Sequence, residues 1–129
     1  MKSKIAVLVF MVLGTSQVLS QEFEWVNVEA KYHSDTESVI EQVDIRNITA
    51  KNGMKFVWLR THFTGSITAT FFNYVRVDCK KKMWQSTYLE GYNRVGLVEK
   101  KDSTNHSFPW NYFDFNDVGD RRTYQLVCG

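Results

Sequence analysis

The sequence lacks the motifs and apolar runs that most enzymes and integral membrane proteins require. It contains no HExxH, GxSxG, CxxC or glycine-rich phosphate loop, so it indicates neither a metal or serine hydrolase nor a nucleotide-binding enzyme. After the first 20 residues, no apolar run approaches the roughly 18 residues that a membrane-spanning helix needs. Proline occurs only once, at Pro109, whereas 4 Trp, 6 Tyr and 9 Phe can fill a core. We therefore expect a folded protein that is neither an enzyme nor embedded in a membrane.

The first 20 residues have the pattern of a secretory signal peptide. Lys2 and Lys4 make a short basic segment, residues 5–14 are apolar, and Ser20 precedes a predicted cleavage at Gln21. Residues 21–129 are then enough for one domain and too few for two. Cleavage removes two of the 16 basic residues, so the rest balance the 14 acidic ones. We expect an exported protein, periplasmic, secreted or at the cell surface, that has no overall charge suited to nucleic acid.

Only two cysteines, Cys79 and Cys128, follow the predicted signal peptide. An even number of cysteines in an exported chain favours a disulfide over free thiols. Two cysteines alone cannot complete a zinc site. We predict a Cys79–Cys128 disulfide, which would stabilise the fold by about 4 kcal/mol in the chain-entropy model.

Alternation of apolar and polar residues predicts one mostly antiparallel β domain. The clearest such stretch is residues 67–79, which directs Cys79 toward the core. Asn52-Gly53 and Gly65-Ser66 are turn signals, and Glu90-Gly91 is interpreted as a third turn. The strands that we expect are residues 25–33, 39–45, 56–63, 67–79, 83–89 and 94–99, followed by a polar loop at 100–107.

The last segment fits a strand and a helix about equally well. Tyr124, Leu126 and Cys128 alternate with their neighbours, as in a strand. In a helix, Asn116 or Asp117 could cap the start, and Arg121, Arg122 and Gln125 would share the solvent face. The pattern alone does not decide between them.

Several short motifs occur in a fixed order along the chain. They are Val43-Asp44 with Ile48, Val57-Trp58-Leu59, Val77-Asp78-Cys79, Gly96-Leu97-Val98, Phe108-Pro109-Trp110, and residues 117–120 with Leu126-Val127-Cys128. In this order they resemble the surface-adhesin protein E family of Gram-negative bacteria. The resemblance covers nearly all of residues 21–129. It implies a sheet of about six antiparallel strands with one C-terminal helix, which the cysteine pair joins to the sheet.

The chain departs from that family in two places. Phe115-Asn116 stands where the family usually has a proline before the helix. The founding adhesins carry a lipid anchor, and this chain has no cysteine near its predicted cleavage site. Anchoring to the surface is therefore not part of the expectation.

Lys80-Lys81-Lys82 is the local run of like charge in this sequence. A Cys79–Cys128 disulfide would bring this run near the end of a C-terminal helix, and thus near Arg121 and Arg122. These basic residues are our candidate ligand-binding residues: Lys80, Lys81, Lys82, Arg121 and Arg122. The alternative is a solvated strand end whose charges discourage pairing with another sheet edge.

Histidines do not form a recognisable catalytic or metal-binding pattern. His33, His62 and His106 lie on separate predicted elements, without the spacing to a carboxylate that a metal site needs. We predict no catalytic residue, no metal and no cofactor.

The predicted function is an exported, non-enzymatic, adhesin-like domain that binds a macromolecule through its surface. The partner that we expect is a protein, such as a host matrix or plasma protein, or an acidic glycan. Two alternatives are a periplasmic inhibitor of a cell-wall hydrolase and a structural component of the envelope. Phe72 and Tyr74 lie on the otherwise polar side of residues 67–79, so a helix or a second copy should cover that face. We therefore expect a two-fold homodimer, as the resemblance also implies.

Overall fold

The computed structural model describes residues 22–129, and the predicted signal peptide with its cleavage site at Gln21 lies outside the described residues. The described chain forms one antiparallel sheet and one C-terminal helix. Its elements are β1 (Trp25–Tyr32), β2 (Ser38–Asp44), β3 (Thr49–Lys51), β4 (Met54–Thr64), β5 (Ala69–Asp78), β6 (Met83–Asn93), β7 (Leu97–Asp102), β8 (Trp110–Tyr112) and α2 (Val118–Cys128). Within residues 22–129, no helix is long and apolar enough to cross a membrane.

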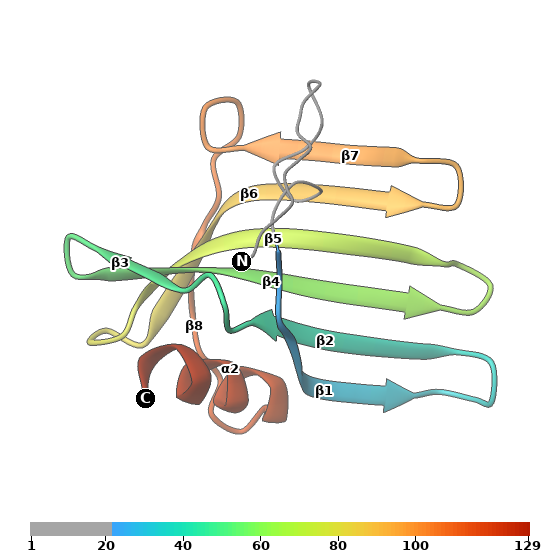
Figure 1. Ribbon diagram of the computed structural model, residues 1–129, viewed down its shortest axis with the longest axis horizontal. Helices are drawn as coiled ribbons and strands as arrows, with labels where there is room; N and C mark the ends of the chain where they lie inside the picture. The colour runs from blue at the N-terminus through green and yellow to red at the C-terminus, as the bar shows by residue number, and fades with distance from the viewer. Residues whose placement is uncertain (1–21) are drawn as a thin grey trace.

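The main strands run up and down in the order β1-β2-β4-β5-β6-β7, as Figure 1 shows. The short strands β3 and β8 pair with the ends of β4 and β6. The longest strands, β4, β5 and β6, therefore form the middle of the sheet, with partners along both sides. This confirms the predicted mainly β fold with a C-terminal helix, although the six expected strands are joined by two short ones.

The turns follow local sequence in part. Asn52 and Gly53 connect β3 to β4 with φ of 54° and 78°, a left-handed conformation that asparagine and glycine adopt most readily. The prediction of a turn at Glu90-Gly91 is wrong, because β6 continues through both residues to Asn93. Position 91 instead leaves no room for a side chain, since a Cβ atom there would lie 2.5 Å from Cε1 of Phe71. A neighbouring strand, and not a turn, requires this glycine.

Two strand boundaries also differ from the expectation. The strand predicted at residues 94–99 begins at Leu97 and continues to Asp102, into the predicted polar loop. Residues 94–96 form the turn, in which the Asn93 side chain accepts hydrogen bonds from the N–H groups of Val95 and Gly96. Ile67, expected to face the core, is 73% exposed in the turn before β5. In both cases an apolar residue at a hairpin tip, Val95 or Ile67, was assigned to a strand because of its apolar side chain.

The core lies between the sheet and α2. It is made almost entirely of valines from neighbouring strands, together with one aromatic residue and one helix residue: Val28, Val43, Val57, Val75, Val77, Phe113 and Val127. β-branched side chains pack well on a pleated surface, so these positions favour both the strands and their burial. The helix contacts mainly β1, with further contacts to β2 and β4.

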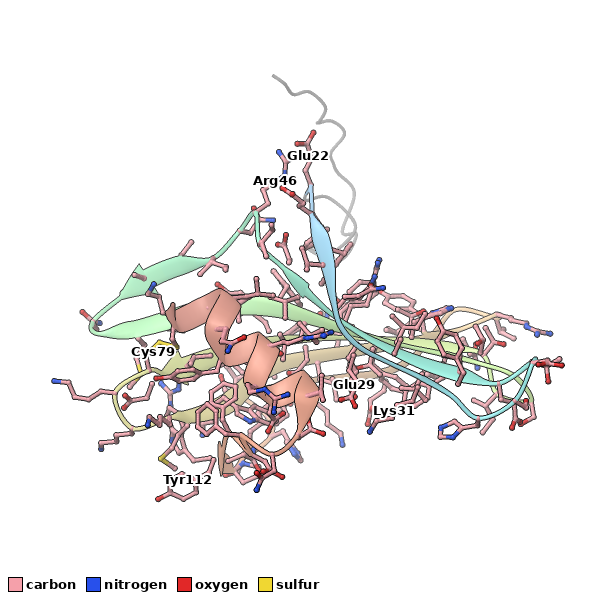
Figure 2. The ribbon with its side chains drawn as sticks, turned by 90° about the horizontal axis from the view of Figure 1, so that it is seen from below. Glu22, Glu29, Lys31, Arg46, Cys79 and Tyr112 are labelled. Atoms are coloured by element: carbon pink, nitrogen blue, oxygen red, sulfur yellow. A yellow bond between two sulfur atoms is a disulfide. The ribbon has the colours of Figure 1, made fainter. Side chains whose placement is uncertain are left out.

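The helix ends are defined by their caps. Asp117 caps the N-terminus, where its carboxylate accepts the N–H of Asp120 at 2.9 Å. At the other end, Cys128 forms a disulfide with Cys79, with the two Cα atoms 5.7 Å apart. Figure 2 shows Cys79 beside the helix. The disulfide joins the last turn of α2 to the end of β5. The predicted disulfide and the helical C-terminus are both confirmed.

The surroundings of Gly119, in the first turn of α2, leave no room for a side chain. A Cβ atom there would lie 2.7 Å from Oε1 of Glu29 and 2.8 Å from Oε1 of Glu41. The N–H of Gly119 donates to Oε1 of Glu29 at 3.1 Å. Close approach of the helix to these carboxylates therefore accounts for a glycine that lowers helix propensity.

Candidate functional site

The strands β1, β2, β4, β5 and β6 give the sheet a second apolar face on the side away from α2. Val57 belongs to the core, and the next residue, Trp58, points to the opposite side because side chains alternate along a strand. Trp58 is only 4% exposed, yet its ring packs against Phe23, Tyr74 and Tyr88 rather than against the helix. We call this side of the sheet the aromatic face.

The rings of the aromatic face form a continuous series across the strands. Phe23 stacks on Trp25 with ring centroids 5.0 Å apart, and Trp25 reaches Phe72 at 6.1 Å. Phe72 in turn meets the edge of Tyr92 at 6.1 Å. The face comprises Phe23, Trp25, Phe56, Trp58, Phe72, Tyr74, Tyr88 and Tyr92. Most of these rings are half-buried against one another, so each leaves part of its surface to solvent.

Two arginines lie on this face, each in contact with a tryptophan. The guanidinium carbon of Arg60 lies 4.4 Å from the centre of the Trp25 ring, and that of Arg76 lies 5.0 Å from the Trp110 ring. Such contacts combine cation–π attraction with planar stacking. Burial lowers the pKa of Arg60, which nevertheless stays protonated at neutral pH. The face therefore presents fixed positive charge beside aromatic rings.

Each arginine is held in place by a glutamine on the neighbouring strand. Arg60 Nε donates to Oε1 of Gln42 at 2.7 Å, and Gln42 donates onward to Oδ1 of Asn27 at 2.7 Å. Arg76 Nε donates in the same way to Oε1 of Gln85 at 2.7 Å. These bonds use only Nε and leave the terminal nitrogens for other partners. Each guanidinium is thus oriented before any ligand arrives.

A groove with a volume of about 510 Å³ runs over this face beside Arg60. Phe72 and Tyr92 contribute its aromatic walls, and Nδ1 of His62 lies 2.6 Å from Oγ1 of Thr70 at its edge. The carboxylate of this face, Glu90, is buried and accepts a hydrogen bond from the Tyr92 hydroxyl. The groove is lined by Ile40, Gln42, Arg60, His62, Thr70, Phe72 and Tyr92. Its charged group at the surface is therefore the Arg60 cation.

The basic residues that the sequence singled out lie elsewhere and converge only in part. Lys80, Lys81 and Lys82 occupy the exposed turn between β5 and β6, where Asp78 accepts the Lys81 N–H at 3.0 Å. Lys82 Nζ lies 5.6 Å from the centre of the Phe115 ring.

The two helix arginines point in different directions. Arg121 donates to the carbonyl oxygen of Phe115 at 2.8 Å, and so it shares that residue with Lys82. Arg122 instead donates to the carbonyl oxygen of Val28 on β1 at 3.3 Å. The structure therefore brings Lys82 and Arg121 to Phe115, whereas Arg122 reaches toward β1.

Sequence reasoning did not identify Arg60, Arg76 and the groove as a site. The signal was present in β4, where Phe56, Trp58, Arg60 and His62 share one parity and Val57 and Leu59 the other. Its significance depends on the neighbouring strands, which supply Trp25, Phe72 and Gln42. Among residues 22–129, no group of three or more His, Cys, Asp or Glu residues is placed to hold a metal ion.

Comparison with family models, curated proteins and solved structures finds no match to this chain. The resemblance to the surface-adhesin protein E family thus stays a prediction.

Proposed function

We propose that this protein is an exported, non-enzymatic binding domain whose aromatic face takes an acidic glycan. The observation that carries the proposal is the pair of arginines, Arg60 and Arg76, each in contact with a tryptophan and oriented by a glutamine. A pyranose ring presents a face of C–H groups that packs on aromatic rings, and its hydroxyls pair with glutamine and histidine. A uronic acid adds a carboxylate, for which a planar guanidinium is the best-matched partner.

The positions of the two arginines on the aromatic face suit an extended ligand. The groove beside Arg60 runs across β2, β4, β5 and β6, and the Arg76–Trp110 pair lies where β8 pairs with the start of β6. Aromatic rings of β4, β5 and β6 occupy the sheet between them. A chain of several sugars can contact both arginines, whereas one sugar contacts a single arginine. The adhesin-like character predicted from the sequence is consistent with this kind of partner, and the disulfide with an exported domain.

The test is binding of purified protein to polygalacturonate, with dextran as the uncharged control polymer. We expect binding to polygalacturonate that weakens as salt rises, because ion pairs at a surface are screened. Arg60→Gln should weaken that binding at least tenfold, and Arg60→Lys should restore it only in part, since lysine keeps the charge without the planar group.

A matched control removes charge outside the aromatic face. The double variant Lys80→Gln/Lys81→Gln changes two exposed lysines in the β5–β6 turn and should leave binding unchanged. If this variant, and not Arg60→Gln, abolishes binding, the lysine run is the site and the aromatic face is not. Tighter binding of single-stranded DNA than of polygalacturonate would also contradict the proposal, because arginines among aromatic rings can stack on bases as well.

A further inference from the structure

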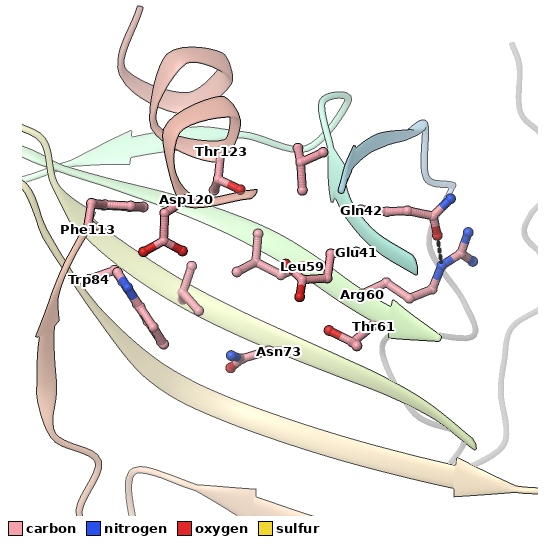
Figure 3. A pocket seen from close by; sticks show the side chains of 12 residues that line it. Glu41, Gln42, Leu59, Arg60, Thr61, Asn73, Trp84, Phe113, Asp120 and Thr123 are labelled. Atoms are coloured by element: carbon pink, nitrogen blue, oxygen red, sulfur yellow. Dashed lines mark hydrogen bonds between the residues drawn. The ribbon is translucent and has the colours of Figure 1, made fainter. Parts of the chain in front are cut away.

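A second cavity lies on the helix side of the sheet and shares only Gln42 and Arg60 with the groove of the proposed glycan site. Its volume is about 210 Å³, and it is bounded by the start of α2, the segment before it, and strands β1, β2, β4, β5 and β6 (Figure 3). Apolar and aromatic side chains make most of its wall: Val28, Leu59, Val75, Trp84 and Phe113. An engineered cavity of about 150 Å³ is large enough for benzene, so this one has room for a small ring with a short substituent.

Polar oxygens from three different elements also line the cavity. Asn73 on β5 also lines the cavity, and its Oδ1, which lies behind the cavity surface, has no hydrogen-bond donor among the described residues. Glu41 on β2 contributes a carboxyl group that no hydrogen bond reaches within residues 22–129. Asp120 on α2 contributes a carboxylate whose Oδ2 accepts the N–H of Asp114 at 2.8 Å. Figure 3 shows these groups around one space, while the Gln42–Arg60 pair lies at its edge.

An enclosed acceptor without a donor is costly, because it loses its hydrogen bonds to water and gains none from the protein. Such groups are uncommon in folded proteins, and each one calls for a specific explanation. Here the Asn73 side chain lies in the wall of a cavity that also holds two carboxyl groups, Glu41 and Asp120. A ligand that donates hydrogen bonds would meet these acceptors.

The charges around the cavity favour a cation. Burial raises the pKa of Glu41, and the nearby Glu29 carboxylate raises it further. Burial likewise raises the pKa of Asp120. The nearby cations have other partners: Lys31 Nζ lies 3.7 Å from Glu29, Arg60 contacts Trp25, and Arg122 donates to the Val28 carbonyl. The charged groups nearest the cavity on the surrounding elements include Glu29, Lys31, Glu41, Arg60, Asp114, Asp117, Asp120 and Arg122.

We propose that this cavity binds a small molecule with a primary ammonium group and a compact apolar body. An ammonium group has three donors and no acceptor, which matches the carboxyl oxygens of Glu41 and Asp120, with the Asn73 oxygen close behind the cavity wall. The apolar body lies against Leu59 and Val75, and the aromatic rings of Trp84 and Phe113 favour a cation near their faces. The cavity is thus a small-molecule site of mixed apolar and polar lining, separate from the aromatic face.

Three probes that share a benzyl group separate the contributions of charge and of N–H donors. Benzylamine is a cation with three N–H donors, benzyl alcohol is its uncharged analogue, and benzyltrimethylammonium keeps the charge without donors. Amide resonances recorded by NMR during titration report binding and its location. We expect benzylamine to shift the resonances of Glu41, Asn73 and Asp120, with the other two probes at least tenfold weaker. Equal binding of benzyl alcohol, or no binding of benzylamine at millimolar concentration, overturns the proposal.

Two variants test the oxygens individually. Glu41→Gln removes the charge and should weaken benzylamine at least tenfold, and Asn73→Leu removes the acceptor while keeping a similar size. Glu99→Gln is the matched control, because Glu99 pairs with Lys101 at 3.1 Å on β7, away from the cavity, and its loss should leave binding unchanged. A thermal melt confirms that each variant is folded. Folded Glu41→Gln and Asn73→Leu proteins that bind benzylamine as tightly as the parent overturn the proposal.

Discussion

Asp44 is a fully buried carboxylate that is surrounded by hydrogen-bond donors. It accepts hydrogen bonds from the backbone N–H groups of Glu24 at 2.8 Å and Arg46 at 3.0 Å, and from Nδ2 of Asn47 at 2.6 Å. Backbone donors to a carboxylate make strong, charge-assisted bonds. Asp44 therefore ties the segment before β1 to the turn after β2.

Replacement of Asp44 should be among the most destabilising single changes. Asp44→Ala leaves buried donors without an acceptor, and we expect a loss of about 3 kcal/mol in the free energy of unfolding. Urea denaturation monitored by tryptophan fluorescence measures it. Asp35→Ala, at an exposed turn residue, is the control and should change stability by less than about 0.5 kcal/mol. Similar losses in the two variants would show that the Asp44 hydrogen bonds contribute little.

Replacement of Glu41 should have the opposite effect, because the charged carboxylate of Glu41 lowers the stability of the folded protein at neutral pH. Its pKa in the folded protein is raised from 4.5, first by burial and then by Glu29, so folding favours the protonated form. Between pH 4.5 and the raised value, the folded protein holds more protons than the unfolded chain. Its contribution to stability therefore decreases as the pH rises through this window.

Glu41→Gln should consequently stabilise the protein at pH 7. Since Glu41 is partly exposed, we expect a gain of no more than about 1 kcal/mol. Thermal melts from pH 3.5 to 7.5 should show a difference from the parent that is largest at neutral pH and vanishes below pH 4.5, where both side chains are uncharged. A variant less stable than the parent at pH 7 would mean that an unrecognised cation pairs with Glu41. The same substitution should also weaken amine binding at least tenfold, which would make the cavity a site where stability is lost in favour of function.

At the scale of elements, α2 is short and depends on its attachments. Eleven residues are too few to form a stable helix alone in water. The Asp117 cap, the hydrogen bond from Tyr124 Oη to the Cys79 carbonyl at 2.7 Å, and the Cys79–Cys128 disulfide hold it against the sheet. The cavity proposed to bind an amine has the first turn of this helix as one wall. The position of α2 therefore decides whether that site exists.

Loss of the disulfide should destabilise the protein substantially. The bridge joins residues 49 positions apart, and in the chain-entropy model such a cross-link contributes about 4 kcal/mol. The double variant Cys79→Ser/Cys128→Ser should unfold at a correspondingly lower urea concentration than the oxidised parent. The reduced parent serves as a control and should match the variant. Equal midpoints for oxidised and reduced protein would show that the helix stays docked without the bridge.

For the whole molecule, the two sides of the sheet differ in chemistry. The helix side carries the valine core and a group of carboxylates that includes Glu29, Glu41 and Asp120. The other side carries aromatic rings with Arg60 and Arg76. A half-buried aromatic face of this extent is typical of a surface that meets a partner. The second copy of the homodimer expected from the sequence would occupy the same face as the proposed glycan.

The dimer stays a prediction, and it can be tested together with the glycan. We expect light scattering at micromolar protein concentration to give the mass of a dimer. If the second copy covers the aromatic face, polygalacturonate should compete with it and lower the protein mass toward that of a monomer. A monomer mass up to the highest attainable concentration would contradict the dimer and leave the aromatic face available to the glycan alone.

The sequence by itself determined the class of fold and much of its layout. Period-2 alternation indicated the strands, Asn52-Gly53 indicated a turn that local backbone preferences dictate, and the two cysteines indicated their pairing. These features are encoded within a few residues or by composition. The helical C-terminus was ambiguous in its pattern, because an eleven-residue segment can satisfy either period, and only the family resemblance favoured the helix.

Only the tertiary structure decided the sites. Gly91 resembled a turn residue, but the ring of Phe71 on the next strand is what requires it. The Arg60–Trp25 contact joins β4 to β1 across β2, and the amine cavity joins Glu41, Asn73 and Asp120 from three elements. The lysine run was conspicuous in sequence because its members are adjacent, although adjacency in a turn does not make them converge. Sites depend on which side chains of neighbouring strands and of the helix come to lie on one face, and the pattern within a single segment does not specify those neighbours.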